Sequence, residues 1–348
     1  MTPQDPRPAP GPLTVGAACF TVLAWASAFV SIRSAGAAYS PGALALGRLL
    51  AGSVVLVALV LIRREGLPPR GAWRGIAVSG VVWFGAYMVA LNWGERLVDA
   101  GTAALLVNVG PILMALLAAR LLGEGLPPRL LTGMGVSFAG AAVVGLSMSA
   151  GSSGSGDVGG STGELVGGVA LCLLAAVAYA VGVVSQKPAL SYGSPLQVTA
   201  FACLIGTAVC LPFSGQLVSE ASRAPMSATL NMVYLGVVPT ALAFTTWTYA
   251  LARTPAGKMG ATTYAVPAIV VLLSWLFLDE VPGWLTLLGG ALCLAGVAVS
   301  RSRARAAVRG TEIVPRVAER PEDRPEDRPE ERAGAQAQER PESAGTGS

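Results

Sequence analysis

Apolar residues run along the chain in stretches of about 20, separated by short turns rich in proline and serine, from residue 13 to residue 300. A helix of roughly 20 apolar residues crosses the hydrocarbon core of a bilayer. The stretches are too long for strands and lack their alternation of polar and apolar positions. The pattern therefore predicts an all-α, polytopic membrane protein with ten transmembrane helices. We expect these near residues 13–33, 41–62, 72–92, 99–120, 127–148, 164–186, 194–213, 228–250, 256–278 and 282–300.

The two halves of the chain repeat each other. Residues 101–143 align without gaps on 257–299, with 12 of 43 positions identical, among them Pro111/Pro267 and Glu124/Glu280. Each half contains five predicted spans, and an odd number forces the second half to enter the membrane inverted relative to the first. Such inverted repeats are typical of secondary transporters, with the substrate site at the repeat interface near the membrane midplane.

These features divide the chain into five parts. We expect a disordered N-terminal tail (1–12), a first five-helix repeat (13–148), a flexible Gly/Ser linker (149–163), a second five-helix repeat (164–300) and a disordered tail (301–348). The last part is rich in Pro and charged residues and contains no aromatic residue, as disordered segments do.

Basic residues lie mostly on one side of the predicted spans. With the N-terminus inside, the inner loops hold ten Lys and Arg residues and the outer loops hold three. The positive-inside rule then places both termini in the cytoplasm.

Composition excludes several functions. Only 13% of the residues are charged, about half the usual share, and the net charge is only +4, so we expect lipid and no nucleic acid as a partner. The chain contains no histidine, which removes His-based catalysis and His metal ligands. No nucleotide-binding loop or metal-ligand spacing occurs, and we expect no cofactor, no metal and no enzymatic activity. All five cysteines lie in apolar stretches and are expected to be buried thiols.

The sequence resembles the EamA family of the drug/metabolite transporter superfamily. The resemblance covers about residues 13–300 and rests on the run WASAFV at Trp25–Val30, on Arg48, and on the paired segments Pro111–Glu124 and Pro267–Glu280. It implies a carrier of the bacterial cytoplasmic membrane, often an exporter. It also implies a central cavity lined by helices one, three, four, six, eight and nine, with helices five and ten at the periphery. One departure is that Ala202 stands where a second copy of Arg48 would lie.

Few polar side chains fall within the spans, and these are the candidate functional residues. Arg48 is the one clearly intramembrane charge; such an arginine faces protein or water and serves either a structural or gating role or contacts substrate. Pro111 and Pro267 are predicted hinges, because proline frees the carbonyl one turn earlier. Asn108 and Tyr264, each three residues before a hinge, are placed to line a polar midpoint.

Aromatic and polar residues at helical spacing complete the predicted substrate site. They are Trp25, Trp83, Tyr87, Tyr179, Thr240 and Trp247. Each aromatic residue taken singly is also explained by core packing or by an interfacial belt.

We therefore expect a secondary transporter that moves small organic metabolites or drugs by alternating access, with export of amino acids or other metabolites favoured. Alternatives are an importer or exchanger of a sugar-linked or nucleoside-type solute, or a membrane-embedded lipid enzyme. Gly133, Ser137, Ala141 and Gly145 form a small-residue stripe in the fifth span. Such a stripe fits close helix contact within the fold or in a homodimer.

Overall fold

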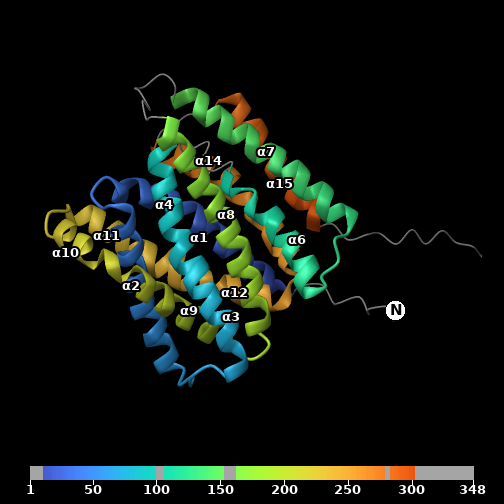
Figure 1. The fold of residues 1–348 in the computed structure, drawn as a ribbon. Helices are drawn as coiled ribbons and strands as arrows, with labels where there is room; N and C mark the ends of the chain where they lie inside the picture. Colours follow the sequence, from blue (N-terminus) through green and yellow to red (C-terminus); the bar gives the residue numbers. More distant parts are fainter. Residues whose placement is uncertain (1–10, 99–105, 153–161, 279–282, 302–348) are drawn as a thin grey trace, which may run out of the picture. The chain divides into compact units, whose positions relative to one another are not determined.

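The structure is a computed structural model that describes residues 11–98, 106–152, 162–278 and 283–301. The described residues belong to one compact unit. The described residues form helices and turns with no strand among them, as predicted (Figure 1). The expected tails at 1–12 and 301–348, and most of the 149–163 linker, lie outside the described residues.

The first half contains α1 (Pro12–Gly36), α2 (Pro41–Ile62), the 3₁₀ turn η1 (Arg70–Ala72), α3 (Trp73–Ser79), the π-helix η2 (Gly80–Tyr87), α4 (Met88–Leu97), α6 (Gly110–Leu122) and α7 (Pro128–Ser152). The second half contains α8 (Thr162–Ala189), α9 (Pro195–Cys210), η3 (Leu211–Phe213), α10 (Ser214–Ala221), α11 (Met226–Leu235), the π-helix η4 (Gly236–Leu242), α12 (Ala243–Arg253), α13 (Ala256–Thr263), α14 (Ala265–Leu278) and α15 (Trp284–Arg301).

By length and composition, six helices of the described residues can cross a membrane. They run over 41–62, 70–94, 128–147, 163–189, 195–221 and 226–253, and three shorter apolar helices cover 12–28, 110–122 and 284–300. The predicted fourth span, 99–120, falls partly on residues outside the described ranges. The structure therefore supports a polytopic membrane protein, and the count of ten spans stays a prediction.

Helix boundaries differ from the predicted ones where the sequence carries no stop signal. The helix α7 continues to Ser152 and α8 begins at Thr162, so both described ends of the predicted linker are helical. The short helix α10 extends the seventh predicted span beyond residue 213. Small residues such as Ala150 and Ser152 do not stop a helix, and no proline intervenes.

Two helices begin alike because Pro41 and Pro195 occupy their first turn, where the missing proline N–H costs nothing. The preceding serines join helix ends from opposite halves. The Ser40 N–H donates to Glu220 Oε2 at 2.7 Å, and the Ser194 hydroxyl donates to Glu65 Oε2. These two contacts lie at opposite ends of the α2–α9 pair.

Two wide helical segments interrupt the third and eighth predicted spans. The π-helices η2 and η4 begin at Gly80 and Gly236, which are corresponding positions of the two repeats. Such π-segments are rare and occur frequently at functional sites. The aligned sequences gave no signal for them beyond the two glycines.

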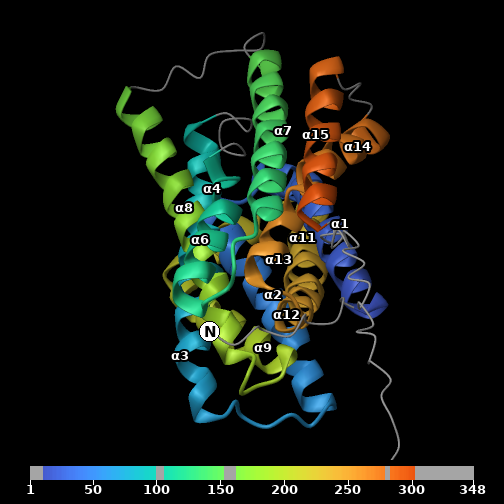
Figure 2. The same ribbon diagram turned by 90° about the vertical axis from the view of Figure 1, so that its right-hand side faces the viewer.

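The helices α7 and α15 lie side by side (Figures 1 and 2). A methyl group added at Gly133 would lie 2.6 Å from the Gly296 carbonyl oxygen, and one at Gly140 would lie 2.6 Å from that of Gly289. The two helices are therefore antiparallel and in backbone contact. The predicted small-residue stripe serves this contact within the fold.

The helices of the two halves interleave. Helix α1 packs against α11, α12 and α14, whereas α8 packs against α3, η2, α4 and α6. Helix α2 packs against η4 and α9 against η2. The packing units thus combine helices from both repeats, in place of the two separate half-chain bundles that the repeat alone suggests.

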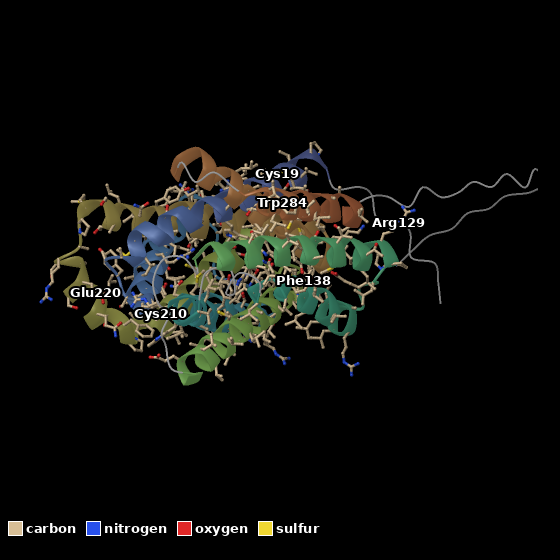
Figure 3. The ribbon with its side chains drawn as sticks, turned by 90° about the horizontal axis from the view of Figure 1, so that it is seen from above. Cys19, Arg129, Phe138, Cys210, Glu220 and Trp284 are labelled. Carbon is tan, nitrogen blue, oxygen red and sulfur yellow. The ribbon has the colours of Figure 1, made fainter. Side chains whose placement is uncertain are left out.

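Large apolar side chains remain exposed, among them Leu61, Ile62 and Trp284. Figure 3 draws the side chains and labels Trp284. Such a surface suits contact with lipid tails. Four of the five cysteines are buried, as predicted, but Cys19 on α1 is exposed. An apolar stretch does not reveal which face turns outward, because both the core and the lipid side of a membrane helix are apolar.

Candidate functional site

Seven aromatic side chains from both repeats meet inside the bundle, and we call them the aromatic cluster: Trp25, Trp83, Phe84, Tyr87, Tyr179, Phe244 and Trp247. Trp83 contacts the greatest share of them, with ring centroids 4.7 Å from Phe244 and 5.6 Å from Tyr179. Trp25 lies 4.9 Å from Trp247. The structure thus brings together five of the six predicted aromatic residues, on α1, η2, α8 and α12; the sixth, Tyr264, has no ring contact with them in the described structure.

Glycines allow these rings to approach neighbouring helices. A methyl group at Gly182 would lie 2.4 Å from the Cβ atom of Trp83, and one at Gly110 would lie 2.7 Å from the Tyr179 ring. Trp83 and Trp247 are fully buried, whereas Trp25 and Tyr87 are partly exposed. The cluster therefore has a packed centre and a partly open edge.

Arg48 lies buried on α2, 6% exposed. Its Nε and Nη2 atoms donate to the Thr240 hydroxyl at 3.2 and 3.1 Å. Thr240 belongs to η4, and its hydroxyl donates in turn to the Leu235 carbonyl. The neighbouring Pro239 carbonyl accepts from Trp25 Nε1 at 3.2 Å. Two predicted residues, Arg48 and Thr240, are therefore bonded to each other beside the cluster.

The predicted proline hinges coincide with real helix breaks. Helix α6 begins at Gly110 beside Pro111, and α14 begins at Ala265, two residues before Pro267. At the first break the Ile112 N–H donates to the Val109 carbonyl. It therefore does not donate to the Asn108 carbonyl, as it would in a regular α-helix. The Tyr264 hydroxyl donates to that carbonyl at 2.8 Å. The Asn108 carbonyl at the first break is thus bonded to a side chain at the second break.

Within the described ranges, corresponding residues of the two repeats touch at several places. Asn108 contacts Tyr264, Ser53 bonds to Thr207 at 2.9 Å, and the Ser137 hydroxyl donates to the Cys293 carbonyl at 3.1 Å. The cluster contacts two of these places, because Tyr179 packs on Gly110 and Phe84 packs on Gly206.

In the part of the chain that the structure describes, buried polar groups without a hydrogen-bond partner include the Ser79 hydroxyl, the Gln186 amide and Trp247 Nε1. Sequence reasoning missed Ser79 and Gln186. Gln186 adjoins Lys187 near the end of a predicted span and therefore resembles an ordinary helix end. A buried polar group left unpaired costs about 1–3 kcal/mol, so each calls for a partner that the resting fold does not supply.

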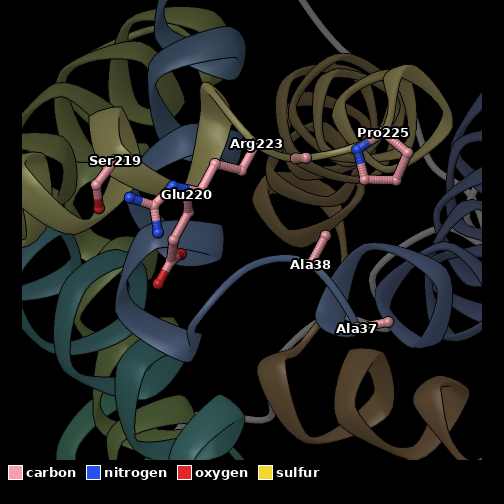
Figure 4. A pocket seen from close by; sticks show the side chains of 7 residues that line it. Ala37, Ala38, Ser219, Glu220, Arg223 and Pro225 are labelled. Carbon is pink, nitrogen blue, oxygen red and sulfur yellow. The ribbon is translucent and has the colours of Figure 1, made fainter.

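A separate depression of about 350 Å³ lies between the residues after α1 and the α10–α11 segment (Figure 4). Ala37, Ala38, Ser219, Glu220, Arg223, Ala224 and Pro225 line it. It lies at one end of the helices, away from the aromatic cluster. Within the described residues, no group of three or more Cys, Asp or Glu side chains could hold a metal ion.

These observations define an all-helical, multi-pass membrane protein with a buried aromatic cluster between its two repeats. The model of the EamA-like transporter family matches the chain twice, over residues 13–146 and 166–302. The chain belongs to this family, which confirms the resemblance found in the sequence. The two matches nearly coincide with the two predicted repeats.

Named relatives agree with this class. A probable terminal-alkyne amino-acid exporter from Streptantibioticus cattleyicolor is 36% identical over 289 residues, covering 83% of this chain and 93% of the relative. The uncharacterized transporter YdfC of Bacillus subtilis is 33% identical, covering 78% and 86%. A solved crystal structure aligns with a TM-score of 0.68 at 25% identity, covering 84% of this chain and 99% of that one.

Proposed function

We propose that this protein is a secondary transporter that exports small organic metabolites, amino acids among them, across the bacterial cytoplasmic membrane by alternating access. The observation that carries the proposal is the contact between corresponding residues of the two repeats at Asn108/Tyr264, Ser53/Thr207 and Ser137/Cys293. Residues that meet their own counterpart lie near a local two-fold axis. The antiparallel contact of α7 with α15 fits an axis in the membrane plane, which inverts one half relative to the other.

In this proposal ten spans form two inverted five-helix repeats with both termini in the cytoplasm. Two inverted halves of similar sequence can exchange conformations, giving inward-open and outward-open states of near-equal energy. The hydrogen bonds Ser40–Glu220 and Ser194–Glu65 support this reading, because they join equivalent positions of the two repeats at opposite ends of the α2–α9 pair. Opening one end requires the hydrogen bonds at that end to break: Ser40–Glu220 with Ser40–Gln216, or Ser194–Glu65 with Gln197–Gly66.

The solute site of this transporter is the partly open edge of the aromatic cluster together with the two helix breaks. Backbone that leaves the helical hydrogen-bond pattern is tolerated in a membrane only inside protein or beside a watery cavity. The residues of the proposed solute site are Trp25, Trp83, Tyr87, Asn108, Tyr179, Thr240, Trp247 and Tyr264. Aromatic walls suit an apolar or unsaturated side chain, which agrees with the alkyne-bearing cargo named for the Streptantibioticus relative.

The experiment compares metabolite levels in medium and cells, with and without the protein, after loading with propargylglycine, an amino acid that carries a terminal alkyne. We expect the protein to lower the intracellular level and to raise the extracellular one. Unchanged levels of every metabolite would contradict transport, and accumulation inside the cell would show import.

A variant at the first helix break makes the test specific. Asn108→Leu removes a polar side chain at the site, so export should fall at least about tenfold while the protein still reaches the membrane. The control Asn231→Leu makes the same change on α11, where Asn231 bonds to the local Ser227 carbonyl, and should export normally. Normal export by Asn108→Leu would remove this residue from the site.

A further inference from the structure

Arg48 carries a buried positive charge that the described protein does not neutralise. The neutral hydroxyl of Thr240 accepts hydrogen bonds from both Nε and Nη2 of Arg48. A charge away from water normally pairs with an opposite charge, because its desolvation costs several kcal/mol. A single hydroxyl cannot replace a carboxylate in that role.

Three described carboxylates are engaged elsewhere, at the ends of helices, and a fourth, Glu164, lies in the first turn of α8. Glu65 accepts from Ser194, Glu220 from Ser40, and Glu124 from the N–H of Gly257. Among the described residues, no ion pair involves Arg48.

The hydrogen bonds of Arg48 also fix how its guanidinium lies. Thr240 holds the Nε and Nη2 edge, so the Nη1 donors make no hydrogen bond to the described protein. A guanidinium carries five N–H donors in a planar fork that matches a carboxylate. One side of that fork is therefore fixed to η4 while the other stays available.

Arg48 lies next to the aromatic cluster. Thr240 follows Pro239, whose carbonyl holds the Trp25 indole, and Tyr87 lies within electrostatic range of Arg48. Trp247 Nε1, in the same cluster, is a second donor without a partner.

We propose that Arg48 binds the carboxylate of the transported solute while the apolar part of the solute lies against the aromatic cluster. The inference rests on the proposed function and narrows it to solutes that carry a carboxylate. Because Ala202 stands at the corresponding position of the second repeat, the site offers one arginine and therefore takes one carboxylate. Thr240 is a positioning residue that orients the guanidinium.

The test measures whether the purified protein distinguishes a carboxylate from a neutral group of the same shape. L-propargylglycine and L-phenylalanine are compared with their amides, which keep the ammonium group and lose the negative charge. Binding is followed by tryptophan fluorescence, since Trp25, Trp83 and Trp247 all lie in the cluster. We expect each acid to bind roughly tenfold or more tightly than its amide, the ratio that corresponds to about 1.4 kcal/mol.

Two variants at position 48 and one control test whether Arg48 causes the preference for the acid over its amide. Arg48→Gln, which can still bond to Thr240, should bring acid and amide within about twofold of each other, whereas Arg48→Lys should keep a reduced preference. Arg96→Gln is the control, because Arg96 donates to the Tyr39 carbonyl away from the cluster, and it should bind as the unmodified protein does. The unfolding temperature of each variant checks that it is folded.

Equal binding of acid and amide by the unmodified protein would overturn the inference. So would a preference that survives in folded Arg48→Gln, or the absence of binding by both acids. The export assay detects cargo of any chemistry. Export by the unmodified protein without a carboxylate preference in binding would overturn this inference alone. No export of any solute by the unmodified protein would overturn the proposed function.

Discussion

Tyr264 illustrates how one side chain makes a broken helix tolerable inside a membrane. The break before Pro111 leaves the Asn108 carbonyl without its usual N–H, and water is not available to replace it. The Tyr264 hydroxyl supplies the missing donor from the other half of the chain. One hydrogen bond thus stabilises the first break and ties it to the second.

Removing that hydroxyl should cost stability. Tyr264→Phe removes the hydroxyl that donates to the Asn108 carbonyl, and we expect a loss of about 1–2 kcal/mol in the free energy of unfolding. Thermal unfolding in detergent measures it. Tyr192→Phe, at a largely exposed tyrosine, should unfold at the original temperature. An unchanged unfolding temperature for Tyr264→Phe would mean that the carbonyl finds another partner.

Single residues could be predicted only where their chemistry is unusual for a membrane helix. The prolines predicted the breaks, and Arg48 stood out as a charge among apolar residues. Their partners could not be predicted, because Thr240 and the Asn108 carbonyl become partners only through packing between distant segments. Gln186 and Ser79 escaped notice because sequence alone does not distinguish a buried polar residue from one at a helix end.

Among the described elements, α7 and α15 form the most extensive helix pair and meet backbone to backbone. Gly133, Gly140, Gly289 and Gly296 permit it, since each lies against the backbone of the facing helix. Small residues are the usual means of helix association in lipid, where no hydrophobic driving force operates between helices.

Adding one methyl group on either face of α7 tests this contact. At Gly140 it would lie 2.6 Å from the Cys293 backbone nitrogen, so Gly140→Ala should destabilise the protein by about 1–3 kcal/mol through overpacking. Gly135 on the same helix has open space around it. Gly135→Ala should therefore be neutral or stabilise by up to about 1 kcal/mol, because alanine favours the helix.

Unfolding temperatures of the two alanine variants give the comparison. Equal effects would indicate that the two helices separate readily or that α15 can shift to make room. A loss for Gly140→Ala alone would support the antiparallel contact.

Helices as elements could largely be predicted, since their length and apolar composition are set by the membrane. Residues 41–62 match α2 from end to end. The π-helices could not be predicted, because their wider turns follow from packing of Gly80 and Gly236 against helices of the other half. The interleaving of the halves was missed for the same reason: the repeat reveals equivalence and says nothing about which helices are neighbours.

At the scale of the whole molecule, the family match, the repeat and the contacts between corresponding residues lead to one account. Two equivalent halves interleave around an aromatic cluster. Equivalent hydrogen bonds, Ser40–Glu220 and Ser194–Glu65, lie at the two ends of α2 and α9. Lipid surrounds the outer apolar side chains.

The most direct measurement of this account is the side of the membrane on which corresponding loops lie. Leu67 follows α2 and is 75% exposed, and Ser222, 155 residues later, follows α10 and is also exposed. Single cysteines at these positions, in a Cys19→Ser background, are treated in intact cells with a thiol reagent that cannot cross the membrane. The account predicts labelling of Ser222→Cys and protection of Leu67→Cys until the cells are opened. Labelling of both, or protection of both, would contradict the inverted arrangement of the two halves.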